Sequence, residues 1–250
     1  MSSPCRSDPK SNDSSVGPAG ERFAELLPEC AVLVEATPSM WESGLLPEEA
    51  AFVRNAVDKR KREFTAGRNA VRKAIEQLGR PVEAIAVGSM REPVLPVGIT
   101  ASITHTADYC AAAAIRKGTI VSLGIDAEAN VPMESELRPL IVSPAEEVTL
   151  SNSLRGLGCD GAKLAFSVKE AFFKAFFQQA RQYLDWRDVE IAAYPERGMF
   201  SAVVLKGDVP AYFRQRRFWG RFRFDSRRIY SVLALPAASD GSASIERTAQ

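Results

Sequence analysis

The sequence predicts an α+β protein built of two similar halves. Three observations support this prediction: helical and strand-like segments occur in mixed order, the mixed set appears twice, and the second set opens near Gly124. An order of this kind, without strict alternation of strand and helix, favours the α+β class. The length of 250 residues suits one large domain or two small halves. No repeat is visible residue by residue, so the order of segments alone supports the two halves.

The ends of the chain differ in composition from its middle. Residues 1–20 are rich in Ser, Pro, Asp and Gly and have almost nothing to bury, so we expect a flexible tail there. The residues after Pro236 are small and polar, which predicts a second flexible tail at 238–250. Between the tails we expect an N-terminal half at 21–120 and a C-terminal half at 121–237.

The N-terminal half shows a long helical stretch between strand-like segments. Pro47 suits the first turn of a helix, and Gly79 is a natural residue at a helix C-terminus. Apolar residues recur at helical spacing between them, which predicts two helices that break near Gly67. Short apolar runs predict strands at 31–34, 84–87, 101–104, 109–115 and 120–126. The last of these leads into the second half.

The C-terminal half repeats this mixture. Ser143 can cap a helix whose first position is taken by Pro144, and a second helix is expected at 161–181. Alternating apolar residues then predict four strands, at 189–192, 200–205, 217–224 and 229–235.

The overall charge argues against a role in which a large net charge attracts the whole protein to its partner. Lys and Arg number 32 and Asp and Glu number 31, so nothing draws the whole protein to nucleic acid or to a membrane surface. Four scattered cysteines form no metal-binding or disulfide framework, which fits a reducing compartment. The N-terminus has no apolar core of a signal peptide, and no apolar run reaches the roughly 18 residues of a membrane span. We therefore expect a cytoplasmic protein without a membrane span.

The segment 124–128 presents two carboxylates after an apolar run. Residues two apart on a strand point to the same face, so Asp126 and Glu128 would lie side by side. Two such oxygen ligands suit Mg²⁺, which leaves its other positions to water and substrate phosphate. The alternative is a strand end with two solvated acids.

The helix expected at 163–178 is apolar around most of its circumference. At about 100° per residue all its polar residues except Lys169 fall within an arc of about 80°; they are Lys163, Ser167, Glu170, Lys174 and Gln178. A stripe this narrow predicts a helix that is buried nearly all round and turns its polar side to a cleft. The alternative is that Glu170 and Lys174 form a simple ion pair one turn apart.

Two further features can bind anions or be structural. His105 is the only histidine, and it ends a strand beside two hydroxyl residues, where it could hold a phosphate or belong to the core. The run 59–73 carries seven cations, which could contact phosphates or form a solvated helix face.

These pieces, in this order, resemble the 4′-phosphopantetheinyl transferases, in particular the bacterial enzymes that activate enterobactin and surfactin synthetases. The matching segments are residues 61–68, 91–93, 102–105, 124–128 and 166–174. The resemblance implies two α+β halves related by pseudo-twofold symmetry, with coenzyme A in the cleft between them. It also implies transfer of 4′-phosphopantetheine from coenzyme A to a serine of an apo carrier protein, with release of adenosine 3′,5′-bisphosphate.

The resemblance also assigns roles to residues. Asp126, Glu128 and Glu170 would hold Mg²⁺ in the C-terminal half, and Glu170 would accept the proton of the serine hydroxyl. Lys174 would neutralise a phosphate oxygen, so that the catalytic set is Asp126, Glu170 and Lys174. The residues expected to bind coenzyme A are Arg62, Arg68, Arg91, Thr104, His105 and Lys174, with Thr104, His105 and Arg68 at the 3′-phosphate and Arg91 at the adenine.

The chain departs from the family pattern at three positions. Thr104 stands where many members have Ser, Phe166 replaces a frequent Trp, and Ala127 offers no ligand between the two acids. The remaining positions on the metal would therefore be taken by water.

The resemblance implies a monomer whose partners are peptidyl or acyl carriers of siderophore, polyketide, nonribosomal peptide or fatty-acid synthesis. Two other functions remain open on the residues alone. One is a different Mg²⁺-dependent phosphoester enzyme, such as a phosphatase or nuclease, with the same acids. The other is a non-catalytic nucleic-acid-binding module built on residues 59–73, which the near-neutral charge and the lack of aromatic residues suited to stacking on bases argue against.

Overall fold

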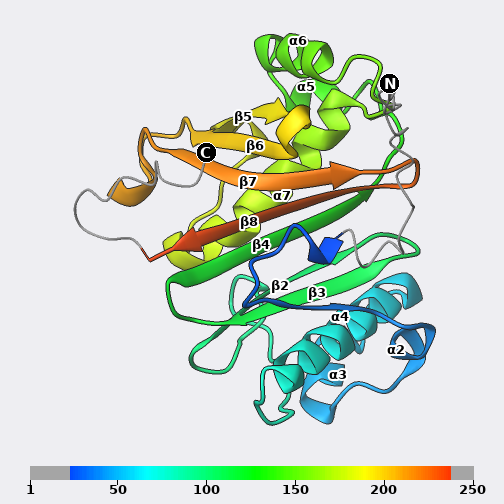
Figure 1. Cartoon of the computed structure of the whole chain (residues 1–250). Helices are drawn as coiled ribbons and strands as arrows, with labels where there is room; N and C mark the ends of the chain where they lie inside the picture. Colours follow the sequence, from blue (N-terminus) through cyan, green and yellow to red (C-terminus); the bar gives the residue numbers. More distant parts are fainter. Residues whose placement is uncertain (1–22, 238–250) are drawn as a thin grey trace, which may run out of the picture.

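The computed structural model describes residues 23–237, so both predicted tails, 1–20 and 238–250, lie outside the described residues. Two antiparallel sheets form the framework, one of three strands in the order β1-β3-β2 and one of five in the order β4-β8-β7-β6-β5. Figure 1 shows α2, α3 and α4 at one end of the molecule and α5 and α6 at the other, with the sheets between them. The predicted α+β class is confirmed.

The elements have the following bounds. The helices are α2 (Pro38–Glu42), α3 (Pro47–Val53), α4 (Asp58–Gln77), α5 (Arg138–Ile141), α6 (Pro144–Ser153) and α7 (Gly161–Ala180), with short 3₁₀ turns η1 (Trp186–Asp188), η2 (Pro195–Arg197) and η3 (Ala211–Phe213). The strands are β1 (Val32–Glu35), β2 (Ile99–His105), β3 (Cys110–Arg116), β4 (Ile120–Ala129), β5 (Val189–Tyr194), β6 (Met199–Val204), β7 (Arg217–Phe224) and β8 (Arg228–Pro236). None of the helices within residues 23–237 has both the length and the apolar character that crossing a membrane requires.

The core has three parts that stack through the molecule. One lies between α4 and the three-stranded sheet, and a second lies between β3 and the outer face of β4 and β8. The third and largest lies between α7 and the five-stranded sheet, where six buried phenylalanines of the described residues gather. They are Phe172, Phe176, Phe200, Phe213, Phe218 and Phe222, with the partly buried Phe166 and Phe224 at the margin. This stacking fixes α7 against β4, where the candidate site lies.

The predicted helix break near Gly67 is wrong. The chain breaks between α3 and α4, and α4 runs through Gly67 without interruption. A Cβ at Gly67 would lie 3.1 Å from Cγ2 of Ile103, so the glycine allows close packing of α4 on β2. The stop at Gly79 is confirmed, because α4 ends at Gln77 and Gly79 takes the left-handed conformation with φ of 71°.

The strand predicted at 84–87 is also wrong. Within it only Val87 forms a bridge, with Pro93, and no ladder follows. The amide of Ile85 donates instead to Oε1 of the buried Glu49, at 2.9 Å. A side-chain carboxylate therefore takes the backbone donor that a ladder would have used.

Glu49 in the first half has a counterpart, Glu146, in the second. Each is the third residue of a helix that begins with proline, and each accepts from the backbone amide of its own cap residue. Each also accepts from a distant backbone amide and pairs with a cation of the long helix 23 residues later, Arg72 or Lys169. We name these two networks the glutamate pins. They are one residue-level likeness between the halves, whose pseudo-twofold relation stays a prediction.

Candidate active site

The site is built where α7 crosses β4. Gly124 makes this crossing possible, because a Cβ there would lie 1.8 Å from the carbonyl oxygen of Ala171. The polar stripe predicted on α7 faces β4 and β8: Ser167 bonds to Ser231 at 3.0 Å, and the amide of Gln178 donates to the carbonyl oxygen of Leu123 at 2.7 Å. The narrow stripe therefore meets the strand that carries the two acids.

Each acid on β4 is paired with a lysine of α7. Asp126 has a side chain only 5% exposed, and its Oδ1 accepts from Lys174 Nζ at 2.7 Å. Glu128 Oε2 accepts from Lys163 Nζ at 2.5 Å. The second oxygen of Asp126, Oδ2, is buried and has no hydrogen-bond partner within residues 23–237. A buried, unpartnered carboxylate oxygen is costly, and it calls for a cation or donor that the protein does not supply.

The pKa of Glu128 is also compatible with a cation beside Asp126 and Glu128. Burial raises the pKa of Glu128, and the negative charge of Asp126 raises it further, while Lys163 opposes both effects. Burial therefore disfavours the charged form of this carboxyl group, and a further cation beside it would favour that form.

Glu170 lies apart from this pair. Its Oε1 accepts from the indole Nε1 of Trp186 at 2.9 Å, and Lys174, one turn along α7, bonds to Asp126 instead. The simple ion pair between Glu170 and Lys174 is therefore not what the structure contains. Within the described residues, no three His, Cys, Asp or Glu side chains gather as a metal-binding group.

A divalent metal nevertheless fits the acids of β4. Mg²⁺ commonly takes one or two protein carboxylates and fills its other positions with water and substrate phosphate. Asp126 and Glu128 supply two carboxylates on one face of a strand, and the buried Oδ2 of Asp126 has no hydrogen-bond partner within residues 23–237. The place of Glu170 as a third ligand stays a prediction.

Strand β2 joins the N-terminal half to this site through hydroxyl groups. Thr104 Oγ1 accepts from the amide of Ala127 at 2.9 Å and donates to Asp126 Oδ1 at 3.2 Å. Ser102 Oγ accepts from the amide of Ile125 at 3.0 Å. Thr104 is buried, so the structure uses its hydroxyl to hold β4 and Asp126 in place. Its predicted contact with a phosphate remains untested.

His105 and two of the predicted arginines lie on the N-terminal side. The His105 imidazole is 36% exposed, with Nδ1 3.9 Å from Glu63 Oε2, and burial lowers its pKa although Glu63 opposes the shift. The Arg68 guanidinium stacks 4.4 Å from the centre of the Phe64 ring, and its buried Nε has no hydrogen-bond partner among residues 23–237. Burial lowers the pKa of Arg68 to about 10. Arg62 is exposed and lies 6.0 Å from the Trp41 ring.

The basic run of α4 is not one solvated face. Arg68 and Arg72 are both buried, and Arg72 pairs with Glu49 in the first glutamate pin. Arg72 therefore serves the core of the N-terminal half and is not available to a nucleic acid.

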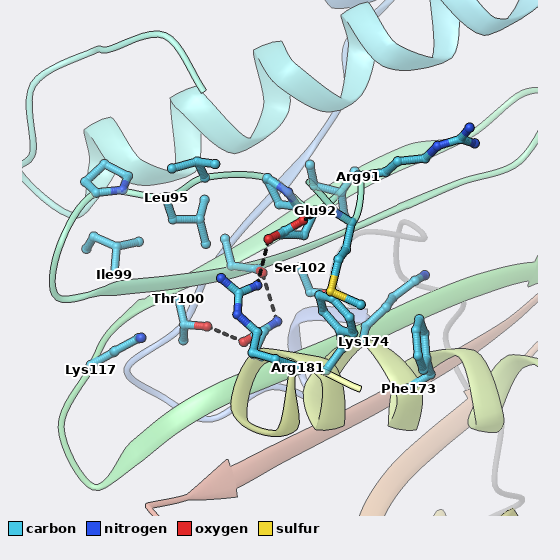
Figure 2. A pocket seen from close by; sticks show the side chains of 18 of the residues that line it. Arg91, Glu92, Leu95, Ile99, Thr100, Ser102, Lys117, Phe173, Lys174 and Arg181 are labelled. Carbon is cyan, nitrogen blue, oxygen red and sulfur yellow. Dashed lines mark hydrogen bonds and ion pairs between the residues drawn. The ribbon is translucent and has the colours of Figure 1, made fainter. Parts of the chain in front are cut away.

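A cavity of about 570 Å³ opens between the loop at 90–98, β2 and the end of α7 (Figure 2). Lys174, the partner of Asp126, lines it, whereas the two acids themselves do not, and Lys117 and Phe173 lie toward opposite ends. Arg91, with φ of 68°, belongs to its lining, but its side chain extends away from Glu92 and Arg181 in Figure 2. His105 and Arg68 do not line this cavity.

Two contacts that join the sides of this cavity were not predicted from the sequence. Arg181 Nη1 pairs with Glu92 Oε1 at 2.9 Å, and the Tyr183 hydroxyl donates to the carbonyl oxygen of Met90 at 3.1 Å. These bonds tie the loop of the N-terminal half to the end of α7. Arg181 is three residues beyond Gln178, so extending the polar stripe by one turn would have found it. Nothing in the local sequence marks Tyr183 or Trp186.

Comparison with known proteins gives consistent matches over most of the chain. Residues 48–115 match the 4′-phosphopantetheinyl transferase N-terminal domain, and residues 122–217 match the 4′-phosphopantetheinyl transferase superfamily. The chain is 35% identical over 220 residues to the 4′-phosphopantetheinyl transferase Svp of Streptomyces mobaraensis, which covers 86% of this chain and 89% of that protein. It is 35% identical over 147 residues to the 4′-phosphopantetheinyl transferase PptT of Mycobacterium tuberculosis, covering 58% and 64% of the two chains. It is 33% identical over 160 residues to enterobactin synthase component D of Escherichia coli K12, covering 60% and 74%.

Proposed function

This chain belongs to the 4′-phosphopantetheinyl transferase superfamily, and from that premise we propose how its own residues carry out the reaction. It is a transferase that moves the 4′-phosphopantetheine group of coenzyme A to a carrier protein. The observation that supports the proposed site best is the Lys174–Asp126 pair with its unpartnered Oδ2, at the edge of the 570 Å³ cavity. A phosphatase or nuclease, and a nucleic-acid-binding module, have no support from the relatives.

The proposed chemistry follows from the charges on β4 and α7. The serine oxygen of the carrier attacks the phosphorus that bears pantetheine, the bond from that phosphorus to the bridging oxygen breaks, and adenosine 3′,5′-bisphosphate leaves. Lys174 lies beside the growing negative charge and stabilises it, and Glu170 accepts the proton of the serine hydroxyl. Mg²⁺ held by Asp126 and Glu128, with Glu170 as the predicted third ligand, would add further positive charge at the pyrophosphate.

The proposed binding mode places coenzyme A across the two halves. The cavity is of the size usual for small-molecule sites, about 300–1,000 Å³. We assign the 3′-phosphate to His105, Arg68 and the neighbourhood of Thr104, the adenine end to Arg91, and a further phosphate contact to Arg62. The buried Nε of Arg68, which has no hydrogen-bond partner in the described part of the chain, supports an anion at this place.

The proposed partners are apo acyl or peptidyl carriers, including those of siderophore assembly, since one similar protein is enterobactin synthase component D. We further propose that the enzyme acts as a cytoplasmic monomer, with halves at 21–120 and 121–237 and the metal site in the second. The scattered cysteines support the cytoplasmic location, because they form no disulfide framework.

Transfer to a carrier is the direct test. With coenzyme A and Mg²⁺, the protein should convert an apo peptidyl or acyl carrier to its holo form, and EDTA should stop the conversion until Mg²⁺ is restored. Mass spectrometry of the carrier measures the result, and a carrier whose acceptor serine is replaced by alanine is the control. Full activity in EDTA would contradict the metal assignment, and no mass gain on any carrier would contradict the transfer.

Recognition of the 3′-phosphate can be measured without turnover. Coenzyme A should raise the Tm more than dephospho-coenzyme A does, and His105→Ala should narrow that difference because one phosphate donor is lost. Arg197→Ala, which removes an exposed arginine far from β2, is the matched control. Equal stabilisation of the parent protein by both ligands would remove the basis for this assignment.

A further inference from the structure

Trp186 lies on a short turn that is fixed on both sides. The amide of Asp185, the residue before η1, donates to Asp188 Oδ2 at 2.9 Å, which closes the turn on itself. Arg187 Nη1 donates to the carbonyl oxygen of Pro139 at 2.9 Å, which ties the turn to α5. The Trp186 ring also packs against Phe166 of α7, with ring centres 5.8 Å apart. The indole is therefore held in a fixed place relative to α7.

The indole N–H is aimed at one oxygen of Glu170. The Nε1 to Oε1 distance is 2.9 Å, within the usual range for an N–H donor to a carboxylate. Within residues 23–237 the structure gives Glu170 no second hydrogen bond and no ion pair. One oxygen is thus fixed, and the other remains available.

The contact lies beside a small cavity that adjoins the large one. Glu170 and Trp186 line a cavity of about 160 Å³ together with Phe173 and Tyr183. The last two residues also line the cavity of about 570 Å³. The available oxygen of Glu170 is therefore next to the space that we assign to coenzyme A.

We propose that Trp186 is a positioning residue for Glu170. A carboxylate on a flexible side chain loses rotational freedom when it binds a metal or receives a proton in one geometry. The indole N–H removes part of this cost beforehand, because it selects one orientation of the carboxylate. This inference rests on the proposed function of Glu170 and adds the group that orients it.

The two changes Trp186→Phe and Trp186→His separate the hydrogen bond from packing. Phenylalanine keeps an aromatic ring against Phe166 but has no N–H. Histidine is smaller, yet its Nε2 occupies the place in the five-membered ring that Nε1 has in tryptophan, and assays at pH 8 keep it neutral. Loss of such an outer partner typically costs about 10–100-fold in activity or metal affinity.

We expect Trp186→Phe to lower kcat about 10–100-fold, leave KM for coenzyme A within about twofold, and raise the Mg²⁺ concentration needed for half-maximal rate. Trp186→His should recover most of the lost kcat. Trp219→Phe is the matched control, since Trp219 is an exposed residue of β7 that packs on Tyr194. Its kinetics should equal those of the parent protein.

An indole resonance gives a readout that does not depend on turnover. In protein with ¹⁵N-labelled tryptophan, Trp41→Phe and Trp219→Phe identify the Trp186 N–H signal by elimination. Glu170→Gln should shift that signal, and so should titration of the parent protein with Mg²⁺ and coenzyme A. The signals of the other two tryptophans serve as internal controls.

The outcomes separate this inference from the proposed function. An inactive Glu170→Gln protein beside a Trp186→Phe protein with kcat within about threefold of the parent would overturn the positioning role alone. Equal loss in the Phe and His variants would assign the effect to packing and also overturn it. An active Glu170→Gln protein would overturn the proposed role of Glu170, and the positioning role with it.

Discussion

Glu170→Gln should lower kcat by about 10²–10⁴-fold, the usual range for a positioned general base. The change keeps the shape of the side chain, and the amide oxygen can still accept from Trp186, so the Tm should stay within about 1–2 °C of the parent protein. Coenzyme A should still raise the Tm, because Lys174, His105 and Arg68 are unchanged. Single-turnover rates with an apo carrier measure the chemical step.

Glu190→Gln provides the matched control for this change. Glu190 is an exposed acid of β5, so its neutralisation alters the net charge in the same way without touching the site. It should leave kcat unchanged. A Glu170→Gln protein with turnover within about threefold of this control would contradict the catalytic assignment.

Gly124→Ala should cost at least about 2–3 kcal/mol of folding stability, because over-packing against backbone cannot be relieved by side-chain rotation. The new Cβ would lie 1.8 Å from the carbonyl oxygen of Ala171 and 2.8 Å from the amide nitrogen of Ala175. The helix has to move away from β4, which lowers the Tm by roughly 5–10 °C. The same movement separates Lys174 from Asp126. Turnover should therefore be lower than in the parent protein even at temperatures at which the variant is still folded.

Gly118→Ala tests whether the effect belongs to the packing. A Cβ at Gly118 meets no atom within 4 Å, and this glycine is not in the left-handed conformation. The change should therefore leave the Tm unchanged or raise it slightly. Thermal unfolding of the two variants in parallel decides the question, and equal Tm values would contradict the tight crossing of α7 and β4.

The parts of the fold that could be predicted are those fixed by local pattern. Helix α7 and the strands of the C-terminal half follow from residues that repeat every 3.6 or every two positions. The two errors, at Gly67 and at 84–87, both depend on residues distant in sequence. Gly67 serves contact with Ile103, and the amide near 85 is taken by Glu49. No local pattern reports either contact.

The site could likewise be predicted only where local periodicity determines it. The two acids of β4 and the polar stripe of α7 could be predicted, because strand and helix periodicity place them on defined faces. Trp186, Arg181 and Tyr183 could not, because they follow the helix in a segment without periodicity and act across to other elements. One of them, Trp186, donates a hydrogen bond to Glu170.

The glutamate pins bear on the order in which the protein folds. Each pin joins a helix start to a cation only 23 residues away, inside its own half. Loops of that length close at small entropic cost, and early local contacts speed folding. During synthesis the first half can therefore fold around Glu49 before the residues near Glu146 have been synthesised. The cleft needs both halves, so we expect it to form last. Coenzyme A should therefore bind only after both halves have folded, and should not stabilise earlier folding intermediates.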